Sequence, residues 1–154
     1  MSAHVPVPAP GHIGLNVSRL DRSIDFYRAV FGFELLQRSA DAARPFAFLG
    51  HDGTIVLTLW QQSDGAFAAD RPGLHHLSFQ VASLDEVRDA ERRLRTAGAR
   101  IHHDGIVAHA EGADSGGLFF EDPDGIRLEI FTLTGVAETD ATTPDATAPT
   151  CGFF

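Results

Sequence analysis

The chain is poor in cysteine, in positive charge and in long apolar runs, and each shortage excludes a class of protein. Its single cysteine among 154 residues, Cys151, excludes an intrachain disulfide and fits a reducing compartment. The formal net charge of -9 disfavours contact with nucleic-acid phosphates and anionic lipids. No stretch approaches the roughly 20 apolar residues of a spanning helix, and residues 1–10 lack the basic start and apolar run of a secretory signal peptide. We therefore expect a cytoplasmic protein without a nucleic-acid or membrane partner.

The chain does contain enough apolar material for a core and many histidines. Hydrophobic residues make up 44% and charged residues 21%, which is an ordinary balance for a globular protein. A length of 154 residues suits one domain or two very small ones. The eight histidines could serve as metal ligands, so their positions in the pattern matter.

The first half of the chain has the pattern of a strand, a helix and three further strands. Residues 11–17 alternate between apolar and polar side chains, as a half-buried strand does. Ser18, followed by Asp21, predicts a capped helix start, and Gly32 predicts the helix end. Three strands with a hairpin turn at Asp52-Gly53 follow, at residues 33–38, 45–49 and 54–61.

The second half repeats this order after a polar segment. Residues 74–81 alternate again, and Ser83 with Glu86 forms the capping-box pattern of a helix that ends at Gly98. Three strands with a tight turn at Asp122-Pro-Asp-Gly125 follow, at residues 100–108, 117–121 and 126–133.

An internal repeat of a whole unit predicts the fold class. One unit alone leaves its sheet half covered, so two must pair. We predict an α+β fold in which two βαβββ modules form a cupped, mostly antiparallel sheet around a metal site. The predicted parts are an extended lead-in (1–10), a first module (11–62), a linker (63–73), a second module (74–133) and a Thr/Ala/Pro-rich tail (134–154). We expect the tail to be disordered or loosely laid on the surface.

Three residues at related positions predict a divalent metal site. His12 and His76 occupy equivalent places on the polar faces of the first strands of the two modules, and Glu129 lies in the last strand. Across one concave surface these side chains would converge. Strand alternation assigns His75 to the buried face, so we prefer His76. Two imidazoles and one carboxylate suit Fe²⁺, Mn²⁺, Zn²⁺, Ni²⁺ or Co²⁺, and three protein ligands leave open positions for substrate.

The same alternation predicts which residues line the cup and bind a small-molecule substrate. They are Asn16, Thr58, Trp60, Ser78, Gln80, Arg127 and Phe131. Together with Phe46 and Phe48, which fit a core role equally well, the aromatic members favour an aromatic substrate. Arg127 would pair with a substrate carboxylate or phenolate, or else with a neighbouring glutamate.

Four segments resemble the vicinal oxygen chelate superfamily, which includes glyoxalase I, extradiol dioxygenases, fosfomycin-resistance transferases and bleomycin-resistance proteins. They are His12-Ile-Gly-Leu-Asn-Val-Ser18, Ser23-Ile-Asp-Phe-Tyr-Arg-Ala-Val-Phe-Gly-Phe33, His76-Leu-Ser-Phe-Gln-Val81 and Phe120-Glu-Asp-Pro-Asp-Gly-Ile-Arg-Leu-Glu-Ile-Phe131. The resemblance covers nearly all of residues 11–133. It implies paired βαβββ modules, metal ligands at His12, His76 and Glu129, and a homodimer.

One departure from the family pattern narrows the expected reaction. Glyoxalase I has a further glutamate ligand where this chain has Thr58, so a three-ligand site of the extradiol or fosfomycin-resistance type is favoured, with Fe²⁺ as first choice. His109 would be the acid or base of an extradiol-like dioxygenase, although the tyrosine of that group is replaced by Phe119 or Phe120. The alternatives are a non-oxidative metal-dependent lyase, isomerase or thiol transferase, and a metal-free protein that binds aromatic drugs.

Overall fold

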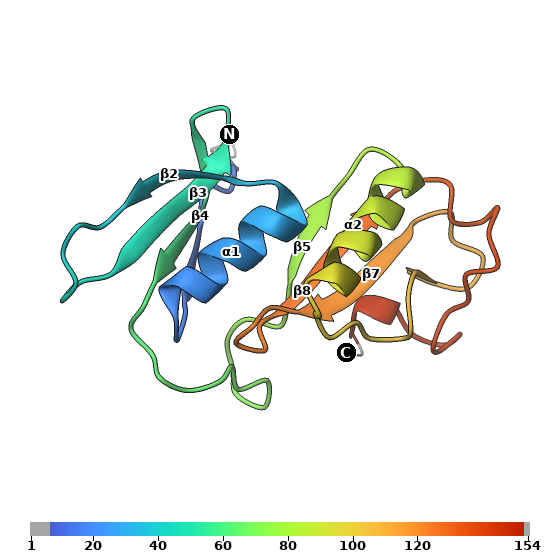
Figure 1. Cartoon of the computed structure of the whole chain (residues 1–154). Coiled ribbons are helices and arrows are strands. Elements are labelled where there is room, and N and C mark those ends of the chain that lie inside the picture. Colours follow the sequence, from blue (N-terminus) through green and yellow to red (C-terminus); the bar gives the residue numbers. More distant parts are fainter. Residues whose placement is uncertain (1–6, 153–154) are drawn as a thin grey trace, which may run out of the picture.

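The computed structural model describes residues 7–152; residues 1–6 of the predicted lead-in and the last two residues of the predicted tail lie outside the described residues. The chain forms two βαβββ modules, which confirms the predicted fold class (Figure 1). The first contains β1 (Ile13–Asn16), α1 (Leu20–Phe31), β2 (Glu34–Arg38), β3 (Phe46–His51) and β4 (Thr54–Trp60). The second contains β5 (Leu77–Gln80), α2 (Leu84–Thr96), β6 (Val107–Ala108), β7 (Gly116–Glu121) and β8 (Arg127–Thr132), and a short 3-10 helix, η1 (Thr150–Gly152), follows.

The two modules contain four-stranded mixed sheets of identical design. The strand order is β1-β4-β3-β2 in the first sheet and β5-β8-β7-β6 in the second. In each sheet the first two strands of this order are parallel and the other neighbours are antiparallel. Figure 1 shows α1 and α2 each lying in front of the sheet of its own module. The sequence repeat is therefore a repeat of a complete folding unit.

Strand alternation decides which face of each sheet a helix covers. Leu57 and Leu59 of β4 are fully buried in the core, whereas Trp60 at the end of the strand is 36% exposed. In β8, Leu128 and Ile130 belong to the core cluster. The residues between them point the other way because successive side chains of a strand alternate. We call the face of each sheet that is turned away from its helix the open face.

Helix α2 begins as the sequence predicts. Ser83 is its N-cap, and the Ser83 hydroxyl oxygen accepts a hydrogen bond from the backbone N–H of Glu86 at 3.3 Å. The Glu86 carboxylate in turn accepts from the backbone N–H of Ala82 at 2.9 Å, one residue before the N-cap, so the contact is a variant of the reciprocal capping-box pair. With 12 and 13 residues, α1 and α2 are too short to cross a bilayer, and no helix within residues 7–152 qualifies as a membrane span.

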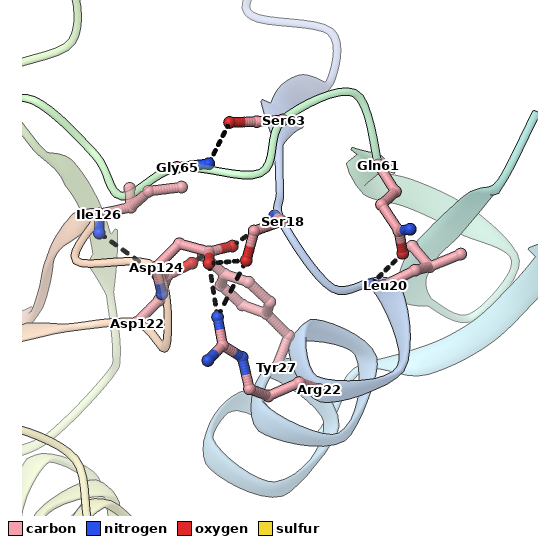
Figure 2. Close-up of polar contacts among 10 residues, drawn as sticks. All are labelled: Ser18, Leu20, Arg22, Tyr27, Gln61, Ser63, Gly65, Asp122, Asp124 and Ile126. Atoms are coloured by element: carbon pink, nitrogen blue, oxygen red, sulfur yellow. Dashed lines mark hydrogen bonds and ion pairs between the residues drawn. The ribbon is translucent and has the colours of Figure 1, made fainter.

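Helix α1 begins differently, and the predicted capping role of Ser18 is wrong. The N-cap residue is Arg19, whose side chain makes no capping hydrogen bond. The backbone N–H of Leu20 donates instead to the side-chain oxygen of Gln61 at 2.7 Å (Figure 2). The hydroxyl of Ser18 instead donates to Asp124 of the second module and accepts from the guanidinium of Arg22.

The strand predicted at residues 100–108 is mostly wrong. Only β6 is a regular strand there, and Ile101 adds an isolated bridge to Phe120. Between them, the consecutive residues 103–105 have φ angles of 60°, 60° and 150°. Three positive φ angles in a row are incompatible with an extended strand, so the chain turns away from the sheet.

Polar contacts around the turn between β7 and β8 join the two modules (Figure 2). The Tyr27 hydroxyl of α1 donates to Asp122 at 2.9 Å, and both side chains are buried. Asp124 accepts from the backbone N–H and the hydroxyl of Ser18, and it forms an ion pair with Arg22. We call this group of five residues the clasp. Its acceptors and donors are satisfied across the module boundary, as buried polar groups require.

Aromatic packing also crosses the module boundary. Phe31, at the end of α1, lies with its ring centroid 4.7 Å from that of Phe79 in β5 and 6.1 Å from that of Phe120 in β7. The guanidinium of Arg93 in α2 donates to the backbone carbonyl of Val30 at 2.8 Å. Both modules therefore share one hydrophobic core.

The described part of the tail lies on the surface of the second module, as one of the two expectations had it, but it is anchored there, so the expectation of disorder is wrong for residues 134–152. Val136 is 1% exposed and Thr150 is 2% exposed. The backbone N–H of Ala108 in β6 donates to the carbonyl of Thr142 at 3.3 Å. Burial of these side chains and the backbone pairing hold a segment whose composition alone predicts disorder.

Candidate metal centre

Glu129 lies in β8, on the open face of the second sheet, and is only 3% exposed. Its Oε2 accepts a hydrogen bond from the Ser78 hydroxyl at 2.6 Å and lies 3.6 Å from Nε2 of His76. Its Oε1 lies 2.7 Å from Nε2 of His109. Two imidazoles and a hydroxyl thus surround one buried carboxylate.

His76 comes directly before β5, which runs parallel to β8 and pairs Ser78 with Glu129. Burial lowers the pKa of His76 by disfavouring the charged ring, and the nearby His75 and Arg127 act in the same direction. The negative charge of Glu129 opposes them, but the net direction is downward. The neutral imidazole that results is the form that binds a metal.

The prediction that His75 belongs to the buried face is wrong, because His75 is exposed. Strand β5 begins at Leu77, so the alternation that would bury His75 does not extend to it. Its Nδ1 lies 2.8 Å from Nδ1 of His76, and the two rings are nearly perpendicular. His75 is therefore a neighbour of the candidate ligand.

His109 lies in the segment before β7 and contacts Glu129 through its Nε2. Its other ring nitrogen, Nδ1, lies 3.0 Å from the Ser115 hydroxyl. A carboxylate can only accept, so the short contact suits a proton on Nε2, and the Ser115 hydroxyl can act as donor or acceptor toward Nδ1. The ring is packed against Phe131, with centroids 5.3 Å apart. The His109 ring is thus held between Ser115 and Glu129.

His12 does not join this group within one chain. It is exposed and comes directly before β1 in the first module. Within residues 7–152, the only three metal-ligating side chains with atoms all within 4.8 Å of one another are the exposed Glu34, His51 and Asp52. The structure therefore brings together His76 and Glu129 from the predicted ligand set, and places His12 elsewhere.

The open face of the first sheet is aromatic. The indole of Trp60 lies with its centroid 5.2 Å from the ring of Phe46 and 6.1 Å from that of Phe48. Its Nε1 donates to the hydroxyl of Thr58 at 3.1 Å. Thr58 is the residue at the position where glyoxalase I has its further glutamate ligand. The side-chain oxygen of Asn16 accepts from the backbone N–H of Gln62 at 2.9 Å and thereby holds the start of the linker.

The remaining predicted binding residues lie on the second module. Gln80 is exposed at the end of β5. Arg127 is half-buried at the start of β8 and close enough to His76 to lower its pKa. Phe131 is half-buried beside His109. These residues share the second sheet with Glu129, so they can border a ligand placed there.

The donor chemistry around Glu129 fits a divalent metal ion. Imidazole nitrogen and carboxylate oxygen are ligands for Fe²⁺, Mn²⁺ and Zn²⁺. A buried carboxylate is costly unless it is paired, and a cation would pair it. Sequence reasoning missed Ser115, which orients His109, because a serine in a polar loop carries no periodic signal.

A model of the Glyoxalase/Bleomycin resistance protein/Dioxygenase superfamily matches residues 9–130. The chain belongs to this superfamily. The resemblance stated from the sequence is thereby confirmed, and it extends over both modules.

Two relatives similar to the chain are named as enzymes with different reactions. The chain is 31% identical over 140 residues to the trivalent organoarsenical cleaving enzyme of Bacillus sp. (strain MD1), a match that covers 91% of this chain and 80% of that one. It is 29% identical over 124 residues to catechol-2,3-dioxygenase of Bacillus subtilis, a match that covers 79% of this chain and 40% of the dioxygenase.

A solved structure supports the same assignment. A superfamily domain from Frankia sp. EAN1pec is 28% identical, has a TM-score of 0.71, and is matched over 98% of its length by 82% of this chain.

Proposed function

We propose that the chain is a metal-dependent superfamily enzyme that acts on a small aromatic or vicinal-oxygen substrate, with an extradiol-like dioxygenase reaction on Fe²⁺ as the best choice. The observation that carries this proposal is the buried carboxylate of Glu129, in contact with His76 and His109 on an open face. Bound there, Fe²⁺ would supply Lewis acidity for two neighbouring substrate oxygens and redox chemistry toward dioxygen.

His76, Glu129 and His12 would hold the ion, with His12 supplied by a second copy of the chain. The two modules have the same design, and His12 holds the position before β1 that His76 holds before β5. A two-fold axis that opposes the first module of one copy to the second module of the other would complete two identical sites. It would also cover the exposed aromatic face around Trp60, which then forms the apolar wall of the cup.

The other residues around Glu129 would orient groups and move a proton. Ser78 holds Oε2 of the carboxylate by its hydrogen bond. His109 has Nε2 at the site and would exchange a proton with a substrate hydroxyl as a general acid or base. Thr58 is a poor replacement for a fourth carboxylate ligand because its hydroxyl is neutral, and its oxygen accepts from Trp60.

Oxygen consumption tests the reaction. Protein loaded with Fe²⁺ without oxygen, and then mixed with catechols in aerated buffer, is expected to consume dioxygen and form a coloured ring-cleavage product. The same protein loaded with Zn²⁺ should be inactive, because Zn²⁺ has no redox chemistry. An iron-loaded protein that consumes no oxygen with any catechol would contradict the dioxygenase reaction.

The same preparations separate the alternatives. Turnover of a hemithioacetal or an epoxide under argon would favour a lyase, isomerase or thiol transferase. Tight binding of a flat aromatic compound that EDTA does not change would favour a metal-free binding protein.

Mixing two inactive variants tests whether the site is shared between copies. His12→Ala and Glu129→Gln should each lose metal binding. A mixed dimer retains one intact site, so random exchange of subunits should restore about a quarter of the wild-type sites. Metal content after co-refolding, measured by atomic emission on the dimer peak, checks this. No recovery from two folded, dimeric variants would show that His12 acts within its own chain or not at all.

A further inference from the structure

Thr150, near the end of the tail, binds two consecutive backbone carbonyls beside the candidate metal centre. Its hydroxyl donates to the carbonyl of Ala108 at 2.6 Å, and its backbone N–H donates to the carbonyl of His109 at 2.9 Å. The side chain is 2% exposed, so these hydrogen bonds are shielded from water. A buried hydroxyl with two backbone contacts fixes the strand end that carries His109.

The tail also binds the other end of the loop that begins at His109. The backbone N–H of Gly135 donates to the carboxylate of Asp114 at 2.9 Å, and that of Val136 donates to the carbonyl of Asp114 at 3.0 Å. Within the loop, the backbone N–H of His109 donates to the carbonyl of Ser115 at 3.0 Å. The loop is thus held at both ends by residues that follow β8.

We propose that the tail is a positioning element of the candidate centre, and that Thr150 is the residue through which it sets the His109 ring between Ser115 and Glu129. The tail lies beyond the residues 9–130 that the superfamily model matches. The positioning of His109 is inferred from hydrogen bonds alone, whereas the effect of this positioning on catalysis rests on the proposed function.

The contacts explain why a small change in the tail would reach the ring. His109 and Glu129 meet at 2.7 Å, and groups that hold a metal ligand in place change its affinity strongly when they are lost. Without the Thr150 hydroxyl, the carbonyl of Ala108 would be left buried without this donor, which favours separation of the tail from β6. The His109 backbone would then be held by the loop only.

Thr150→Val tests the proposal in the metal-free protein. At constant pH, long-range ¹H–¹⁵N NMR of wild-type protein should show His109 with its proton on Nε2, whereas Thr150→Val should show a mixture of both tautomers. Amide hydrogen exchange at Ala108 and His109 should become about tenfold faster, the effect of one lost buried hydrogen bond. Thr150→Ser keeps the hydroxyl and should behave like wild type.

The matched control is Thr147→Val. Thr147 lies in the same tail, but it is exposed and its hydroxyl donates only to the neighbouring Asp145. Unchanged His109 signals in Thr150→Val, or equal changes in Thr147→Val, would overturn the proposal. So would faster exchange throughout both modules, because that would indicate general destabilisation.

The kinetic test is separate from the structural one. If the chain has the proposed activity, Thr150→Val should lower kcat about tenfold or more with little change in KM. A chain without that activity would still show the loss of the His109 tautomer, so the failure of one proposal can be distinguished from the failure of the other.

Discussion

Replacing Glu129 by glutamine is expected to weaken divalent-metal binding by at least about a hundredfold, because even loss of groups behind a ligand costs ten- to a hundredfold. The amide is neutral, and one of its two terminal atoms is a donor. In Glu129→Gln that donor would face Nε2 of His109 or the hydroxyl of Ser78, which donates to the wild-type carboxylate. Competition with a chromophoric chelator for Fe²⁺ or Mn²⁺ measures the loss.

Glu121→Gln is the matched control. Glu121 lies in β7 of the same sheet, but it contacts His102 and Arg100. Its replacement should leave metal affinity within about twofold of wild type, as expected for a residue away from the ion. Equal losses in the two variants, or wild-type affinity in Glu129→Gln, would place the metal elsewhere, for example at the exposed group of Glu34, His51 and Asp52.

Replacing Asp122 by alanine is expected to lower the free energy of unfolding by about 3 kcal/mol or more. The carboxylate is 5% exposed and accepts from the Tyr27 hydroxyl and from the backbone N–H groups of Asp124 and Ile126. The alanine variant leaves three buried donors without this acceptor. Burial raises the pKa of Asp122, so relief of this desolvation offsets part of the loss. Urea unfolding followed by circular dichroism measures the change.

Two further variants serve as comparisons for the stability loss of Asp122→Ala. Asp122→Asn keeps an acceptor for the backbone and should lose less stability than Asp122→Ala. Asp85→Ala removes an exposed carboxylate that pairs with Arg88 on the surface of α2, and it should change stability by less than about 1 kcal/mol. If Asp122→Ala were as stable as Asp85→Ala, the clasp would not hold the modules together.

Local patterns predicted the fold well because both modules are built from regular alternation. Leu57, Leu59, Leu128 and Ile130 lie where period 2 places them, and Ser83 caps α2 as its spacing to Glu86 predicts. The same rules failed where a distant residue competes for a group. Ser18 bonds to Asp124 across 106 positions of the chain, and no local pattern contains that partner.

The candidate site was predictable in composition but not in assembly. Alternation assigns His76 and Glu129 to an open face, and the structure places them together. Alternation does not indicate whether a module of the same chain or of a second copy faces that surface. Convergence of His76 and Glu129 with His12 therefore stays a prediction. The role of Thr150 was not predicted for another reason. A tail rich in Thr, Ala and Pro carries no periodic signal, and the burial of Thr150 depends on the surface of the second module against which it packs.

The turn between β7 and β8 that supplies the two aspartates of the clasp has a counterpart in the first module, the turn between β3 and β4, and the two turns differ. The turn between β3 and β4 contains Asp52, whose side chain is 85% exposed, whereas the turn between β7 and β8 contains the buried Asp122 and Asp124. Likewise Thr58 and Trp60 lie on β4, whereas β8 carries Glu129. The first module thus presents the aromatic face, whereas the second supplies the buried carboxylate of Glu129 and the two aspartates of the clasp. The two modules are therefore not interchangeable: a chain built from two copies of the first would lack the buried carboxylate, and one built from two copies of the second would lack the aromatic face.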